Sequence, residues 1–165
     1  MAYYGFFPNV PMDSVENGRY PETMYDTVFE PEHVLGAFLM VRRSAVEEIG
    51  GWDARFFMYF EETDFCYRLV KSGLGIRYSP DYALIHYGGR STSQVHEEMS
   101  VEFYRSQAFF YRKNYGLGRY LLLKAIVLLG LSYWTLRSMA SVVRGRIDRA
   151  LYRTRLRNYA RILVM

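Results

Sequence analysis

A chain of 165 residues, half of them hydrophobic and 18% aromatic, has enough apolar side chains to build the core of one domain with an appendage. Its single cysteine, Cys66, excludes a framework of internal disulfides. Residues 1–99 hold 8 Lys and Arg against 15 Asp and Glu, whereas residues 100–165 hold 13 against 2, so we expect the C-terminal part to face an anionic partner.

The first forty residues predict a loop followed by a buried strand. Prolines interrupt residues 1–32, which show no sustained period of 2 or 3.6 and are expected to be irregular. Residues 33–42 form a continuous apolar run that is typical of a buried strand. Gly36 within this run indicates that a ligand or another backbone approaches closely there.

A short helix and a glycine turn are expected next. Ser44 and Glu47 have the spacing of a capping box at the start of a helix, which Gly50 would end. Trp52 and Asp53 follow in the turn. A large aromatic after such a turn usually fills a core, but an exposed ring near a polar site would suit stacking on a sugar. Both interpretations of Trp52 stay open.

Three acids stand at the start of the next predicted helix, which covers residues 61–72 and ends at Gly73. Spacing places Glu62 on the apolar face of this helix, so its carboxylate is predicted to turn inward. Glu61 instead shares a face with Asp64 and with Arg68 one turn later. The apolar face comprises Phe65, Cys66, Leu69 and Val70.

Two interpretations of these acids are compatible with the spacing. Acids at a helix N-terminus interact favourably with the helix dipole by ~0.3–1 kcal/mol each, which needs no function. Alternatively, one carboxylate acts as a general base while its neighbours orient substrate hydroxyls. The residues concerned are Glu61, Glu62 and Asp64.

A histidine ends the second of two short predicted strands, residues 75–79 and 82–87. His86 precedes a flexible glycine-containing loop, residues 88–91. A lone histidine beside apolar residues is more often a hydrogen-bonded core residue than a metal ligand. Cys66 and His86 lack a second ligand pair at recognisable spacing, which argues against zinc.

The C-terminal third predicts helices. Residues 97–115 favour an amphipathic helix that ends at Gly116, and residues 121–136 are apolar but too short and interrupted for a membrane span of ~20 residues. A basic helix is expected from Arg144 onward. The favoured interpretation is an amphipathic tail on an anionic membrane surface, and the alternative is a helical hairpin that packs on the domain or on the missing half. A recognisable nucleic-acid motif is absent, so no nucleic acid is expected as partner.

Several pieces of the chain, in order, resemble the second half of the catalytic domain of family 2 glycosyltransferases, especially their rhamnosyltransferase-like branch. The pieces are Gly36-Ala37-Phe38-Leu39-Met40 with Arg42-Arg43, Ile49-Gly50-Gly51-Trp52-Asp53, Phe57-Met58-Tyr59-Phe60-Glu61-Glu62-Thr63-Asp64 with Arg68, Gly73, Tyr78-Ser79-Pro80, and Ile85-His86-Tyr87-Gly88-Gly89-Arg90-Ser91. The clear match covers about a third of the chain. The segment from Arg105 to Gly116 also resembles the helix that follows in these enzymes.

The resemblance implies roles for individual residues. Glu62 stands where the family places the base that takes the proton of the acceptor hydroxyl, although the family usually has Asp there. Glu61 and Asp64 match the flanking acids, and His86 matches a ligand of the divalent metal, Mn²⁺ or Mg²⁺. The acceptor side of the site would comprise Trp52, Asp53, Gly36, Ala37 and Arg90.

The resemblance also implies an α/β fold, a partial GT-A-like nucleotide-diphospho-sugar transferase domain. Residues 1–115 would form its acceptor-side half, and residues 116–165 a basic, apolar helical tail. Nothing the size of the nucleotide-binding half precedes Gly36, and the chain contains no Asp-x-Asp motif for the metal. We therefore expect the donor site to need metal ligands from a separate N-terminal half.

The leading hypothesis is a glycosyltransferase fragment at the cytoplasmic face of the membrane. It would take a sugar from a nucleotide-sugar donor, with inversion, to a glycan or lipid-linked acceptor in cell-surface polysaccharide or glycolipid synthesis. The alternative is a non-catalytic glycan- or membrane-binding module that has lost its donor half. The acidic cluster favours the first hypothesis, and the missing Asp-x-Asp half favours the second.

Overall fold

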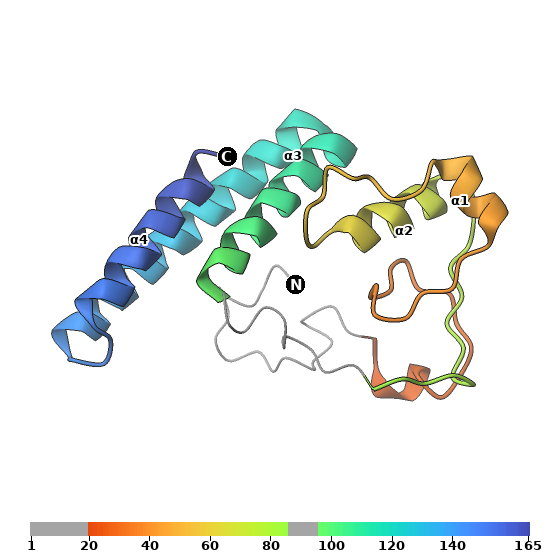
Figure 1. The fold of residues 1–165 in the computed structure, drawn as a ribbon, viewed down its shortest axis with the longest axis horizontal. Coiled ribbons are helices and arrows are strands. Elements are labelled where there is room, and N and C mark those ends of the chain that lie inside the picture. Colours follow the sequence, from red (N-terminus) through yellow and green to blue (C-terminus); the bar gives the residue numbers. More distant parts are fainter. Residues whose placement is uncertain (1–19, 86–95) are drawn as a thin grey trace. The chain divides into compact units, whose positions relative to one another are not determined.

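The computed structural model describes residues 20–85 and 96–165, which form two units (Figure 1). The first unit comprises residues 20–53 and 62–85, and the second comprises residues 54–61 and 96–165. Each unit has a hydrophobic core of its own. The helices, in chain order, are the 3-10 helix η2 (Glu22–Met24), α1 (Arg43–Ile49), α2 (Glu61–Lys71), α3 (His96–Val143) and α4 (Arg149–Leu163).

The core of the first unit is built around the apolar face of α2. Phe65 and Cys66 are fully buried there, and Leu69 and Ile76 are nearly so. Partly buried side chains from α1 and its flanking segments complete this core, namely Val34, Leu39, Val41, Ala45, Val46, Ile49 and Leu74. The predicted helical periodicity is therefore confirmed for three of the four apolar positions. The prediction for Val70 is wrong, because this side chain is 46% exposed.

Glycines end both helices of the first unit, as their positions predict. Gly50 after α1 and Gly73 after α2 adopt φ values of 79° and 85°, in the left-handed region that only glycine enters without strain. The predicted N-cap of α1 is wrong. Arg42 occupies the cap position without a side-chain hydrogen bond, and Glu47 binds Arg43 one turn back, with Oε1 2.7 Å from Nε.

The predicted strands do not form a sheet within residues 20–85. Residues 33–42 contain a turn around Gly36 and lie largely at the surface, so the prediction of a buried strand is wrong. Residues 75–79 and the described part of 82–87 likewise form no ladder, although the turn between them is present. An isolated antiparallel bridge joins Phe29 to Tyr78. A strand needs a neighbour for its backbone groups. Here Val34, Leu39 and Val41 pack on the core around α2, whereas Leu35, Phe38 and Met40 are exposed.

The second unit is a bundle of three helical segments, because α3 reverses direction in its middle (Figure 1). Gly116 interrupts α3 with φ 78° and ψ −174°, which confirms the predicted helix end at this residue. The chain after Gly116 packs back along the first segment, and α4 lies against both. The core they share contains Val101, Leu123, Val127, Leu131 and Ile162.

The aromatic segment before α2 is anchored to the first part of α3 within the second unit. Ser106, which is 5% exposed, donates a 2.7 Å hydrogen bond from Oγ to the carbonyl oxygen of Met58. Phenylalanine rings of α3 contact this segment in the pairs Phe56–Phe109, Tyr59–Phe103, Phe60–Phe103 and Phe60–Phe110. Tyr59 and Phe60 adopt φ values of 65° and 64°, a strained conformation for aromatic residues.

The apolar stretch of the predicted tail lies in α3 and belongs to the bundle. By length and composition alone, the region Glu98–Val143 is apolar enough to cross a membrane, and 22% of its most apolar window is buried in the described structure. The hairpin interpretation of residues 121–136 therefore describes their packing. Attachment to a membrane surface stays a prediction.

Candidate active site

The three acids at the start of α2 lie in different environments. Asp64 is fully buried, and its Oδ2 accepts a 2.8 Å hydrogen bond from Nε of Arg68. Glu62 belongs to the first unit, whereas Glu61 belongs to the second. Consecutive helical residues diverge by about 100° around the helix axis, so neighbours in sequence do not share a face. Asp64 therefore lies on a different face of α2 from Glu62 and is already bound by Arg68.

Glu62 turns toward the segment that carries Gly36. A methyl group placed on Gly36 would lie 3.5 Å from Cβ of Glu62 and 3.8 Å from its Cγ. One carboxylate oxygen of Glu62 is buried and has no hydrogen-bond partner among residues 20–85 and 96–165. The structure thus confirms the inward orientation, and the base role stays a prediction. The expected close approach of a ligand or another backbone to Gly36 is not seen among the described residues, where the neighbour is the Glu62 side chain at ordinary van der Waals distance.

Cys66 lies one helical turn after Glu62 and is fully buried. Burial raises the pKa of the Cys66 thiol, and the nearby charge of Glu62 raises it further. The thiol is therefore protonated at neutral pH and behaves as a small apolar side chain. It supplies neither a nucleophile nor a metal ligand to Glu62.

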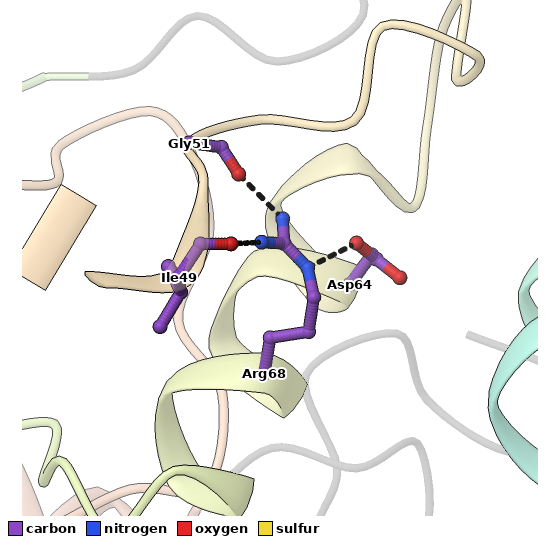
Figure 2. A network of polar contacts seen from close by, with 4 residues as sticks. All are labelled: Ile49, Gly51, Asp64 and Arg68. Carbon is purple, nitrogen blue, oxygen red and sulfur yellow. Dashed lines mark hydrogen bonds and ion pairs between the residues drawn. The ribbon is translucent and has the colours of Figure 1, made fainter. Parts of the chain in front are cut away.

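Arg68 connects α2 to the turn that follows α1 (Figure 2). Its Nη1 donates to the carbonyl oxygen of Ile49 over 2.7 Å, and its Nη2 donates to that of Gly51 over 2.6 Å. With the bond to Asp64, all three guanidinium nitrogens are engaged. The i, i+4 spacing of Asp64 and Arg68 was visible in the sequence. The two carbonyl partners, 19 and 17 residues away, were not.

Trp52 lies against α2 with one face and leaves the rest of its ring accessible. Its ring stacks on that of Phe65 with a centroid distance of 4.0 Å and an interplanar angle of 13°. The residue is nevertheless 46% exposed. One face of Trp52 therefore packs on the core, as the first interpretation predicts, and its outer part stays at the surface, so stacking on a sugar stays a prediction. Asp53, the next residue, is partly buried.

Of the remaining predicted site residues, one is exposed and two lie outside the described residues. Ala37 is exposed beside Gly36. His86 and Arg90 lie outside the described residues, as does the predicted loop 88–91. In the described ranges, no group of three His, Cys, Asp or Glu side chains is arranged to hold a metal ion. These residues alone do not fit a complete metal site, so the divalent metal stays a prediction that needs further ligands.

The comparison with known proteins identifies the family of the chain. Residues 13–161 match the model of the family described as glycosyl transferase family group 2. The chain belongs to this family. It is rhamnosyltransferase-like within the family, as the resemblance of its motifs indicated.

Curated relatives of this family 2 glycosyltransferase chain are similar to it over part of their length. N-acetylglucosaminyl-diphospho-decaprenol L-rhamnosyltransferase of Mycobacterium tuberculosis is 42% identical over 59 residues, 36% of this chain and 19% of the relative. Rhamnosyltransferase WbbL of Escherichia coli is 39% identical over 67 residues, 40% of this chain and 25% of the relative. Low-salt glycan biosynthesis hexosyltransferase Agl10 of Haloferax volcanii is 33% identical over 73 residues, 44% of this chain and 23% of the relative.

The matched segments thus span about a fifth to a quarter of the length of these relatives. No solved structure matches the chain significantly. Membership of the family supports sugar transfer as its chemistry.

Proposed function

We propose that this chain supplies the acceptor side of a GT-A-type family 2 glycosyltransferase and that Glu62 is the base. The observation that carries the proposal is the environment of Glu62. Its carboxylate is turned inward, and one oxygen is buried without a partner among the described residues. Burying an unsatisfied carboxylate oxygen is unfavourable, and a hydroxyl donor from a substrate would satisfy it.

In the proposed reaction, the acceptor hydroxyl oxygen forms a bond to the anomeric carbon of the donor sugar. The bond from this carbon to the diphosphate oxygen breaks, the nucleotide diphosphate leaves with the electron pair, and the configuration inverts. Glu62 takes the hydroxyl proton. Trp52 and Asp53, in the turn held against α2, bind the acceptor, with Gly36, Ala37 and Arg90 beside them.

The metal part of the proposal concerns the donor. A divalent ion such as Mn²⁺ or Mg²⁺ neutralises charge on a leaving diphosphate. His86 is the ligand that this chain would offer, and the remaining ligands would come from a separate nucleotide-binding half. The donor is a nucleotide sugar, and the acceptor is a glycan or lipid-linked glycan of cell-surface polysaccharide or glycolipid synthesis. The similarity to a relative named for N-acetylglucosaminyl-diphospho-decaprenol supports a lipid-linked acceptor.

The base role is tested by Glu62→Gln, which keeps the size of the side chain and removes its charge. Transfer is measured from UDP- and dTDP-sugars to a short-chain N-acetylglucosaminyl diphospholipid, with a nucleotide-binding half supplied in trans. Loss of a general base predicts a rate reduced about 10²- to 10⁴-fold. Glu48→Gln, on the exposed side of α1, is the matched control and should leave the rate unchanged.

Transfer by Glu62→Gln at the parent rate would exclude the base role. Titration calorimetry with UDP and dTDP, with and without Mn²⁺, examines the donor side of the chain by itself. Metal-dependent binding would mean that part of a donor site lies in these 165 residues. Acceptor binding without transfer in any assembly would favour the alternative, a non-catalytic glycan-binding module.

We further propose that the second unit attaches the protein to the cytoplasmic face of a membrane. After Gly116, α3 exposes an apolar stripe at intervals of seven residues, with exposed fractions of 61%, 68%, 63% and 83% for Leu122, Leu129, Leu136 and Val143. The stripe is distinct from the buried positions that face the other helices. α4 adds exposed arginines, namely Arg149, Arg153, Arg157 and Arg161. An apolar face with cationic neighbours suits the surface of an anionic bilayer.

Co-sedimentation with phosphatidylcholine vesicles, with and without 30% phosphatidylserine, tests this attachment. The parent protein should bind the anionic vesicles, and Leu129→Glu should weaken binding at least tenfold, because a carboxylate replaces the centre of the stripe. Leu35→Glu, which alters a comparably exposed leucine of the first unit (52%), is the control and should bind as the parent does. Equal binding by Leu129→Glu and the parent would show that the stripe does not carry attachment.

A further inference from the structure

The turn between α1 and Trp52 has little regular structure of its own. Gly50 and Gly51 both have positive φ values, 79° and 70°, and glycines of this kind leave a turn with wide conformational freedom. Two backbone hydrogen bonds, from the N–H groups of Gly50 and Gly51 to the carbonyl oxygen of Val46, close the end of α1. Contacts with another element can fix the direction in which the chain leaves this turn beyond what these capping bonds define.

Arg68 supplies these contacts from α2. Its two terminal nitrogens bind the carbonyl oxygens on either side of Gly50, those of Ile49 and Gly51 (Figure 2). A guanidinium group is planar and presents its donors in a fixed fork, so two carbonyls bound by it are held at a defined separation and direction. A lysine ammonium group has no such fork.

Asp64 fixes the guanidinium in turn. Its carboxylate is fully buried, and the Arg68 side chain is only 20% exposed. A buried ion pair is a poor source of net stability, because both charges lose their water. Its retention here is explained better by orientation, since Asp64 holds Nε of Arg68 while Nη1 and Nη2 reach the turn.

Phe65 adds a second contact between the same helix and the same turn. Trp52 follows Gly51 directly and stacks on Phe65, which follows Asp64 directly. The guanidinium carbon of Arg68 also lies 5.7 Å from the Phe65 ring centroid. Arg68 thus holds the backbone of the turn, and Phe65 holds the Trp52 ring. Both residues belong to α2, whose first turn carries Glu62.

We propose that Arg68, oriented by Asp64, is a positioning residue that holds the acceptor-binding turn, residues 50–52, in a fixed position relative to the base, Glu62. The inference rests on the proposed function and assigns to Asp64 a role other than direct catalysis. Arg68 touches neither substrate nor reacting atoms in this scheme. It acts through the carbonyl groups of Ile49 and Gly51, and so through the placement of Trp52.

The test uses the full chain with Trp134→Phe, which leaves Trp52 as the single tryptophan. Arg68→Lys keeps the charge and removes the fork. We expect acrylamide to quench Trp52 at least twofold more efficiently in this variant, since the ring is no longer held on Phe65. With the partner half supplied, the KM for the N-acetylglucosaminyl diphospholipid should rise about tenfold, while the KM for the nucleotide sugar stays unchanged.

Two further variants separate positioning from a general loss of structure. Lys71→Met removes an exposed cation of the same helix outside the network and should alter neither readout. Asp64→Asn keeps the shape of the carboxylate and should shift both readouts in the direction of Arg68→Lys. Circular dichroism verifies that each variant retains its helices.

Parent-like quenching of Trp52 in Arg68→Lys would overturn the proposal, as would a lower kcat with an unchanged acceptor KM. The fluorescence measurement needs no turnover, so it tests the positioning role of Arg68 even if Glu62→Gln shows that the base is elsewhere. Conversely, increased quenching of Trp52 in Arg68→Lys together with full activity of Glu62→Gln would support the positioning role of Arg68 and refute Glu62 as the base.

Discussion

Replacing Gly116 by alanine should weaken the second unit, because this glycine makes the turn that folds α3 into a hairpin. Its φ of 78° and ψ of −174° lie in a region that is almost restricted to glycine. Gly118, two residues later, lies in the helical part of α3 and has no neighbouring atom within 4 Å of an added Cβ. Gly118→Ala is therefore a matched control that differs in backbone conformation rather than in crowding.

The two substitutions should have opposite effects on the free energy of unfolding. An alanine forced into the conformation of Gly116 costs about 1–3 kcal/mol. The site is open, with no atom within 4 Å of the added Cβ, so the whole effect comes from the backbone. At Gly118, alanine in place of glycine within a helix should stabilise by about 0.5–1 kcal/mol.

Urea denaturation in a Trp52→Phe background measures this difference, with Trp134 as the single tryptophan reporting on the second unit. Fluorescence and circular dichroism at 222 nm should show a lower midpoint for Gly116→Ala and an equal or higher midpoint for Gly118→Ala. Equal midpoints for the two variants would refute the reasoning, since they would mean that the reversal of α3 does not depend on the glycine conformation.

Two further predictions concern single buried groups. Burial lowers the pKa of His33 below its usual 6.5, so the unfolded chain takes up the proton first as the pH falls. The stability contributed by neutral His33 is therefore complete above pH 6.5 and declines as the pH falls below it. Between pH 7 and 5, the unfolding free energy of the parent protein should decline more steeply than that of His33→Gln. Ser106→Ala leaves the carbonyl of Met58 without its donor and should destabilise by about 1–3 kcal/mol in urea denaturation. Ser132→Ala, at an exposed position, is its control and should stay within about 0.5 kcal/mol.

Sequence was sufficient where local chemistry decides the structure. Gly50, Gly73 and Gly116 ended helices as predicted, because the need for a positive φ is a property of one residue. The inward turn of Glu62 followed from helical spacing to Phe65 and Cys66, which also needs no distant partner.

The predictions that failed depend on distant partners. An apolar run becomes a strand only where another strand pairs with it, and residues 33–42 have no such neighbour in the described part of the chain. The bonds from Arg68 to Ile49 and Gly51 likewise depend on how two segments pack. The sequence pattern therefore identified Asp64 and Arg68 as a pair on one helix, but not the turn that this pair holds.

The environments of Asp64 and Glu62 narrow the choice of base between these two acids. Asp64 is fully buried and binds a guanidinium group, so it is neither accessible to an acceptor hydroxyl nor able to give up Arg68 without releasing the turn. Glu62 has a buried oxygen with no partner in residues 20–85 and 96–165, one helical turn before the ring that supports Trp52. Glutamate has one more methylene than the aspartate usual at this position in the family, and a Cβ placed on Gly36 would lie 3.5 Å from Cβ and 3.8 Å from Cγ of Glu62, which is ordinary van der Waals contact.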